Sequence, residues 1–155
     1  MNEKLITISA ASDDDYEFSY QVKKAAEGDL IQKTFGWDEA FQRDFHKKEW
    51  TEKQPSIIKV DDNPIGTVAL TENDGQIEIG QFFIQPEYQN RGIGTIILHR
   101  ALQKADEVQA IIKLAFLRGN RAESLYRRNG FQLVAQTETH CYMERRPRKT
   151  SQPDS

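Results

Sequence analysis

Cysteine is nearly absent from this chain of 155 residues, where Cys141 is the only one. A single cysteine excludes an intrachain disulfide and a metal site built from clustered thiolates. We interpret Cys141 as a small core residue rather than as an acyl carrier. The 3 histidines are scattered without carboxylates at metal-ligand spacing, so the sequence predicts no metal site.

Long apolar runs are also missing. No segment approaches the roughly 20 apolar residues that a membrane-spanning helix needs, and the apolar stretch 5–8 is too short for the core of a signal peptide. We therefore expect a cytoplasmic protein without membrane contact. An excess of positive charge is missing too, because 24 acidic and 21 basic residues leave a formal charge of -3. Such a chain lacks the positive field that nonspecific nucleic-acid binding requires.

The length fits one ordinary domain, and no linker or internal repeat divides the chain. We expect a single domain over residues 1–146 and a polar, disordered tail over residues 147–155. A basic cluster stands before the polar end of the chain, and we interpret it as solvated. Its members are Arg145, Arg146, Arg148 and Lys149.

The N-terminal third of the chain carries two helical patterns. Acidic residues 13–15 can cap the first helix, which we expect to end or bend at Gly28. Trp37, Phe41 and Phe45 stand four residues apart and predict a second helix, running to about residue 50. We expect most of this aromatic stripe to pack in the core against a sheet.

The rest of the chain changes between extended and helical periodicity. Turn signals at residues 61–64 and 73–75 separate extended runs, which we expect to pair as three antiparallel strands in series. The expected strands are residues 5–8, 56–60, 65–70, 77–84, 111–116, 132–136 and 139–144, and the later helices are marked by residues 93–105 and 122–126. The pattern predicts an α+β fold with a mixed sheet.

The segment 84–95 passes from a strand through a turn directly into an amphipathic helix. Gly92 and Gly94 let a ligand approach the backbone closely, and a helix N-terminus presents unpaired amides and partial positive charge. Arg91 adds a cation beside them. The turn therefore predicts a cradle for an anion such as phosphate, although the glycines could also serve only to end a strand and start a helix.

Two common phosphate motifs do not fit this turn. A dinucleotide fingerprint requires a third glycine where Ile97 stands, and no Gly-Lys-Ser/Thr of a P-loop occurs in the chain. The pattern that remains is Gln/Arg-x-x-Gly-x-Gly/Ala, filled by Gln89, Gly92 and Gly94.

A second motif follows about thirty residues later, where Asn120 precedes Ala-x-x-Leu-Tyr-x-x-x-Gly-Phe at residues 122–131. In this order, the two motifs resemble the GNAT superfamily of acyl-CoA-dependent N-acyltransferases, over roughly residues 65–144. The resemblance implies a mixed, mostly antiparallel sheet of about seven strands with helices on both faces. It also implies that the fourth and fifth strands splay apart and that acetyl-CoA enters between them.

The resemblance assigns roles in cofactor binding. The amides around residues 89–95 would hold the CoA pyrophosphate, and the strand near Phe83 and Ile84 would pair with the pantetheine and orient the acetyl carbonyl. Asn120 would stabilise its loop or touch the cofactor. The predicted cofactor-binding residues are Phe83, Ile84, Gln89, Asn90, Arg91, Gly92, Ile93, Gly94, Thr95, Asn120 and Tyr126.

Transfer from a thioester to an amine requires a neutral amine, a polarised carbonyl and a proton for the departing thiolate. The resemblance places Tyr126 where the family often has a general acid, and the alternative is a core tyrosine. Glu78 stands where histone-acetylating members carry a base. Partial desolvation on its strand would favour Glu78 as the base, and the alternative is an ordinary solvent-facing strand glutamate. A base that acts through ordered water is also open.

We expect the acceptor site to lie among the N-terminal helices and the last hairpin. The candidates, chosen by position, are Tyr20, Trp37, His46, Gln81, His140 and Tyr142. His46 could instead be a surface histidine, and His99 is expected to face solvent.

The predicted function is direct transfer of an acetyl group from acetyl-CoA to a primary amine of a small molecule or peptide in a ternary complex. The alternative is a non-catalytic domain that senses acyl-CoA or acts as a scaffold. The resemblance leaves a homodimer open.

Overall fold

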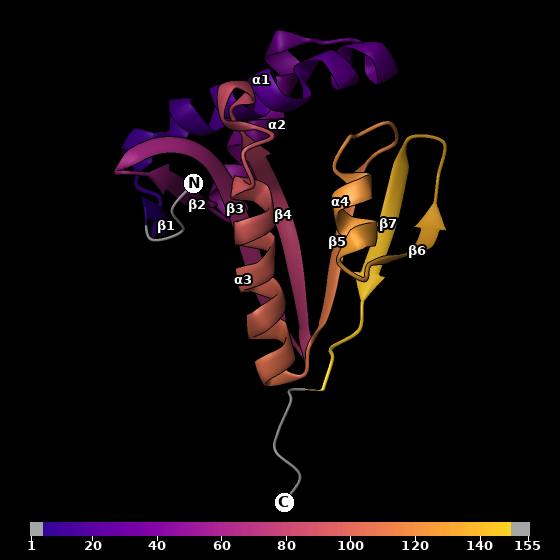
Figure 1. The fold of residues 1–155 in the computed structure, drawn as a ribbon. Helices are drawn as coiled ribbons and strands as arrows, with labels where there is room; N and C mark the ends of the chain where they lie inside the picture. Colours follow the sequence, from indigo (N-terminus) through magenta and orange to yellow (C-terminus); the bar gives the residue numbers. More distant parts are fainter. Residues whose placement is uncertain (1–4, 150–155) are drawn as a thin grey trace, which may run out of the picture. The chain divides into compact units, whose positions relative to one another are not determined.

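The computed structural model describes residues 5–149. Its helices are α1 (Tyr16–Phe35), α2 (Glu39–Glu52), α3 (Ile93–Val108) and α4 (Glu123–Arg128), and its strands are β1 (Ile6–Ala10), β2 (Ser56–Val60), β3 (Asn63–Asn73), β4 (Gln76–Ile84), β5 (Ile111–Leu117), β6 (Gln132–Gln136) and β7 (His140–Arg145) (Figure 1). Short 3-10 helices cover Asp13–Asp15 and Pro86–Tyr88. The predicted elements are thus present.

The strands form a seven-stranded sheet in the order β1-β2-β3-β4-β5-β7-β6. β4 and β5 are parallel, whereas β1–β2, β2–β3, β5–β7 and β6–β7 pair antiparallel. The hairpin predicted at residues 61–64 is confirmed, because Ser56 pairs with Val68 and Val60 with Asn63. A mixed sheet with helices confirms the predicted α+β class.

The chain divides into two compact units, and β3, β4 and α3 each run from one into the other. Unit 1 contains residues 5–69 and 80–94 of the described chain, and unit 2 contains residues 70–79 and 95–149. In unit 1, the core is built from residues of β1, β2 and β3 and from one side of α1, and β2 buries adjacent residues on both of its faces. This core includes Ile6, Tyr20, Val22, Ile57, Ile58 and Ile65.

Helix α1 corrects the expectation that Gly28 ends or bends the first helix. Gly28 lies inside α1, which continues to Phe35 and ends at Gly36, a residue with φ +81°. A glycine within a helix costs only about 1 kcal/mol relative to alanine, which flanking helix formers and tertiary packing can offset. The terminating residue is therefore the glycine that has the left-handed φ, not the first glycine along the chain.

Helix α2 corrects the expected aromatic core stripe. Phe41 and Phe45 are 61% and 45% exposed, and their rings stack with centroids 6.2 Å apart. The buried residues of α2 are instead Gln42, His46 and Trp50, which also stand four residues apart. Since the two rows differ by a single position, the spacing alone indicated a stripe without indicating which of two neighbouring stripes faces inward.

The core of unit 2 contains residues of α3 and of strands β5 and β7. It includes Ile97, Leu98, Ala101, Ala105, Ile112, Leu114, Phe116, Cys141 and Met143. Cys141 is 5% exposed, which confirms its interpretation as a core residue.

Arg145 does not belong to a solvated basic cluster, contrary to the expectation. It is 3% exposed on β7, and its guanidinium donates two hydrogen bonds to Asp106 of α3, at 2.9 and 3.2 Å. The Arg148 amide also donates to Asp106, so this carboxylate holds the end of the described chain against α3. Arg146, Arg148 and Lys149 follow β7 without regular structure, and the last residues of the predicted tail, 150–155, lie outside the described chain.

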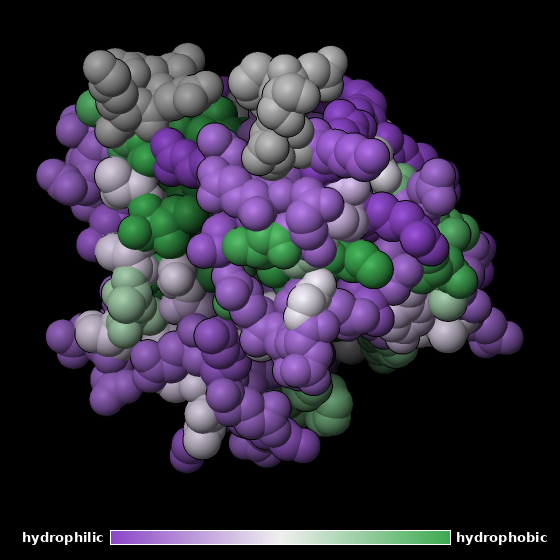
Figure 2. Space-filling view, turned by 90° about the horizontal axis from the view of Figure 1, so that it is seen from below, coloured by the Kyte–Doolittle hydropathy of each residue, from purple (hydrophilic) through white to green (hydrophobic). Residues whose placement is uncertain are grey.

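Hydrophilic residues dominate the face shown in Figure 2, where hydrophobic residues occur in small groups between them. Within residues 5–149, none of the helices combines the length and the apolar character needed to cross a membrane.

Candidate functional site

The loop between β4 and α3 is built by backbone conformations that few residue types adopt. Asn90 and Gly92 have φ of +61° and +83°, which turn the chain from the strand into the helix. The Gln89 side chain donates to the Ile84 carbonyl at 2.8 Å and closes the loop onto the end of β4. A Cβ at Gly92 would meet nothing within 4 Å, so open space lies where its side chain would project.

The start of α3 presents main-chain donors. Within the described chain, no backbone carbonyl accepts a hydrogen bond from the amides of Gly92, Ile93 or Gly94. The amide of Gln89 instead donates to the Pro86 carbonyl at 3.1 Å. The predicted anion cradle therefore excludes the Gln89 amide and is limited to the residues nearest the helix. Thr95 is half-buried in the first turn of α3.

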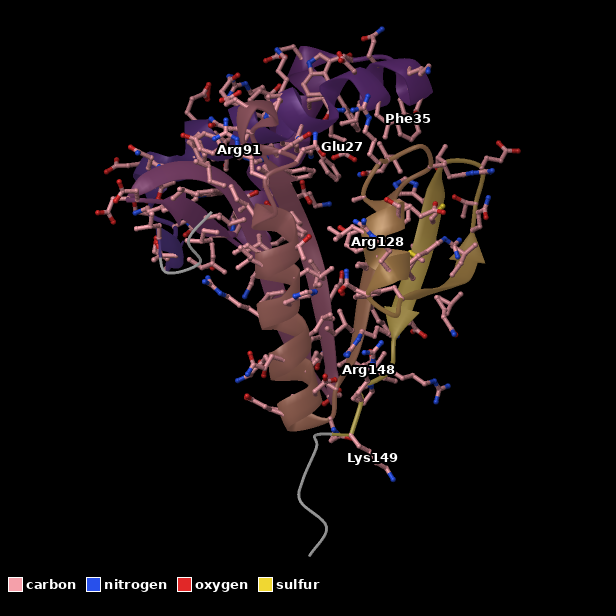
Figure 3. The ribbon with its side chains drawn as sticks, viewed as in Figure 1. Glu27, Phe35, Arg91, Arg128, Arg148 and Lys149 are labelled. Carbon is pink, nitrogen blue, oxygen red and sulfur yellow. The ribbon has the colours of Figure 1, made fainter. Side chains whose placement is uncertain are left out.

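Arg91 adds positive charge to this loop. Its guanidinium lies 5.3 Å from the centre of the Tyr88 ring, and Figure 3 labels it in the segment before α3. Among the described carboxylates, none forms an ion pair with Arg91. The loop therefore combines free amides with an available cation, as an anion site requires.

The second half of β4 has an irregular backbone. Gln81 has φ +46°, and its carbonyl accepts a hydrogen bond of 2.7 Å from the Thr67 hydroxyl of β3. Farther along, the Phe83 carbonyl lies so close to Gly66 of β3 that a Cβ there would be 2.3 Å from it. Because the peptide bonds are trans, the N–H of each following residue points away from β3.

Two main-chain donors, the amides of Phe82 and Ile84, are thereby turned to the side of β4 opposite β3. The ladder between β4 and β5 joins Gln76–Ile79 to Ile111–Leu114, so both amides lie beyond it. A strand edge of this kind can pair with an extended ligand.

Asn120 and Tyr126 lie in unit 2, on either side of the start of α4. The Asn120 side chain accepts a hydrogen bond from the Ala122 amide at 2.8 Å, so it stabilises its own loop, one of its two expected roles. Tyr126 is 6% exposed, and its ring centre lies 5.7 Å from that of Phe116 and 5.6 Å from that of Phe131.

Glu78 occupies an exposed position of β4, opposite Lys113 of β5 in the ladder. Of the two alternatives considered for this residue, the structure shows the solvent-facing one.

Three acceptor candidates meet in unit 1, at the packing surface of α1 and α2. Tyr20 is 1% exposed, with its ring 3.7 Å from the Arg43 guanidinium and its centroid 6.3 Å from that of Trp37. His46 is buried rather than on the surface, and its Nε2 lies 2.7 Å from the Ser19 hydroxyl. Burial, with the nearby charges of Lys23 and Arg43, lowers the pKa of His46 to about 4, so its ring is neutral at pH 7.

The three remaining acceptor candidates lie on strands β4 and β7. His140 and Tyr142 lie on β7 with ring centroids 6.3 Å apart, and the Thr139 hydroxyl is 2.8 Å from His140 Nδ1. Gln81 uses its side chain to bind the Lys53 carbonyl at 3.1 Å. His99 is exposed as expected and lies 2.8 Å from the Asn129 side-chain oxygen.

An open groove in unit 2 contains none of the predicted site residues. It is lined by His99, Leu102, Gln103, Asp106, Glu107, Arg148 and Lys149, the last two of which Figure 3 labels.

The sequence interpretation missed Thr67 and Gly66, which contact β4 directly. A glycine inside the apolar run 65–70 was a usable signal, because an isolated glycine in a strand often marks the close approach of another backbone. Nothing in the sequence indicated the partner of the Thr67 hydroxyl.

The sequence profile of the acetyltransferase (GNAT) family matches residues 22–131 of the chain. No curated protein shows significant sequence similarity to this chain.

Solved acetyltransferase structures share the fold. The chain is similar to PaiA N-acetyltransferase from Thermoplasma acidophilum, solved with coenzyme A, with a TM-score of 0.72 and 18% identity over 91% of this chain and 98% of that one. The ribosomal-protein-S18-alanine N-acetyltransferase from Escherichia coli gives a TM-score of 0.68 and 15% identity over 97% and 98% of the two chains. An acetyltransferase from Thermus thermophilus gives 0.69 and 16% identity over 91% and 96%.

Proposed function

The chain belongs to the acetyltransferase (GNAT) family, and on this premise we propose that it transfers an acetyl group from acetyl-CoA directly to a primary amine in a ternary complex. The observation that carries the proposal is the set of main-chain amides at Gly92, Ile93 and Gly94, which lack carbonyl partners in the described chain and lie beside Arg91. The CoA diphosphate is the anion that such a helix start binds, because each oxygen can accept from an amide and the helix dipole favours the charge.

The acyl end of the cofactor binds along β4. The amides of Phe82 and Ile84 face away from β3 and can donate to the thioester and pantetheine carbonyls. A donor fixed in advance near the thioester oxygen stabilises the negative charge that develops there when the amine attacks.

Tyr126 donates the proton that the CoA thiolate needs. It is buried between the rings of Phe116 and Phe131, which fix the position of the phenol. Because Glu78 is exposed, we assign the removal of the amine proton to Glu78 acting through ordered water rather than in direct contact.

The acceptor is a primary amine of a small molecule or peptide. The S18-alanine enzyme named above acts on a protein substrate, so a peptide amine is one arm of the test. In unit 1, the residue proposed to contact the acceptor is Trp37, whose ring packs on Tyr20, which in turn packs on His46. In unit 2, His140 and Tyr142 of β7 are separate candidates for an acceptor contact.

The test is release of the CoA thiol from acetyl-CoA across a panel of amines that includes polyamines, amino sugars, amino acids and short peptides. The expected result is release that depends on one amine class, with the acetylated amine identified by mass. Calorimetric titration with acetyl-CoA is run beside it. Tight acetyl-CoA binding with every amine left unmodified would support the alternative function, a non-catalytic acyl-CoA sensor.

A further inference from the structure

Gln81 adopts a backbone conformation that its residue type avoids. Its φ of +46° lies in the left-handed region, yet it stands inside β4 and carries a side chain. Such a conformation persists only where the surrounding structure holds it, and it is concentrated at functional sites.

Two hydrogen bonds hold Gln81, one at each end of the residue. The hydroxyl of Thr67, which is 1% exposed, donates to the Gln81 carbonyl at 2.7 Å. The Gln81 side-chain amide donates at 3.1 Å to the carbonyl of Lys53, the C-cap residue of α2. That carbonyl is one of those a helix end leaves without an internal partner, so the bond satisfies both groups.

The bond to Thr67 also sets the direction of the next peptide. With the Gln81 carbonyl held toward β3, the N–H of Phe82 in the same trans peptide must point the other way. An extended Gln81 without the Thr67 bond would direct this amide elsewhere, because φ and ψ at one residue rotate the whole following peptide.

We propose that Thr67 and Gln81 are positioning residues for acetyl transfer, which hold the bend in β4 so that the amide of Phe82 donates to the thioester carbonyl of acetyl-CoA. The inference rests on the proposed function. Neither side chain touches the reacting atoms, and both act through the main chain of β4. Thr67 is the more informative of the two, because its hydroxyl is buried and makes a single identified contact with β4.

The test uses acetyl-CoA carrying carbon-13 at the acetyl carbonyl and isotope-edited infrared spectra of the bound thioester. A hydrogen bond to the carbonyl lowers its stretching frequency, and this readout requires no acceptor amine. In the wild-type enzyme we expect a lowered frequency relative to acetyl-CoA in water. In Thr67→Val, which replaces the hydroxyl by a methyl of similar size, we expect at least half of that shift to be lost while the Kd for acetyl-CoA changes by less than about twofold.

Two controls separate positioning from general destabilisation. Thr67→Ser keeps the hydroxyl and should restore the shift, and Thr71→Val removes an exposed hydroxyl from the same strand and should leave the shift unchanged. With an acceptor in hand, kcat of Thr67→Val should fall about tenfold or more at unchanged KM for acetyl-CoA, since a small misplacement of a reacting group is costly. If Thr67→Val does not fold, Gln81→Val is measured instead, because a β-branched residue resists the left-handed conformation, and the same loss is expected.

A wild-type shift retained in the folded Thr67→Val enzyme would overturn the positioning role while leaving the proposed function intact. Failure of the wild-type enzyme to bind acetyl-CoA would overturn the proposed function, and the positioning role with it.

Discussion

Replacing Gly66 by alanine tests the close approach of β3 to β4. The added Cβ would lie 2.3 Å from the Phe83 carbonyl oxygen, 3.3 Å from the Phe83 carbonyl carbon and 3.2 Å from the Ile84 Cα. All three atoms belong to the backbone, so no side-chain rotation can relieve the contact. Since non-bonded heavy atoms prefer about 3.5 Å, the two strands must separate locally by about 1 Å.

The expected cost is about 2 kcal/mol of unfolding free energy, within the range for overpacking a close-packed site. For a chain of this size that corresponds to a melting temperature lowered by roughly 4–8 °C. Acetyl-CoA affinity should also fall, because the separation displaces the peptide that turns the Ile84 amide outward. Gly80→Ala is the matched control, since a Cβ there meets nothing within 4 Å, and it should cost less than about 0.5 kcal/mol. Equal melting temperatures for the two variants would refute the reasoning.

Three further predictions concern charge and chemistry. Asp106→Asn leaves the buried Arg145 without its anion and should cost about 3–5 kcal/mol in chemical denaturation; a loss under 1 kcal/mol would contradict it. Burial lowers the pKa of His46 to about 4, so the unfolded chain binds a proton at this histidine more tightly than the folded chain does. The unfolding free energy should therefore be full above about pH 6.5 and fall by up to about 3 kcal/mol as the pH drops to 4. His46→Gln should flatten this pH dependence. Tyr126→Phe should lower kcat at least about tenfold with acetyl-CoA affinity unchanged, and an unchanged rate would remove its acid role.

Most of the fold followed from periodicity and turn signals. The β2–β3 hairpin and the strand–turn–helix unit at Gly92 were predictable because a turn residue and a change of period mark each boundary locally. The end of α1 and the inward face of α2 were not. Both depend on how the two helices pack. Gly28 stays helical inside the packed helix α1, and His46 is buried by the rings of Tyr16, Tyr20 and Trp50.

Of the candidate site, too, one part was predictable from the sequence and another was not. The cradle before α3 was predictable because the free amides of a helix start are a local property of the backbone. The bend at Gln81 was not, since it is held by Thr67 and Lys53, residues 14 and 28 positions away along the chain. Arg145 illustrates the converse error, in which a cation placed in a basic run by sequence is paired with an aspartate 39 residues away.

Gly66 and Gly92 each exclude a side chain for a different reason, so substitutions at the two positions should affect the enzyme differently. At Gly66 the backbone conformation is ordinary and the obstacle is the neighbouring strand, so any side chain displaces β4. At Gly92 the space is open and the obstacle is φ +83°, which asparagine tolerates far better than valine. Gly92→Asn should therefore keep the loop and its amides, whereas Gly92→Val should release them and weaken acetyl-CoA binding. A Gly92→Asn enzyme that loses affinity as completely as Gly92→Val would show that the cofactor needs the open space itself, and the amides would no longer carry the site.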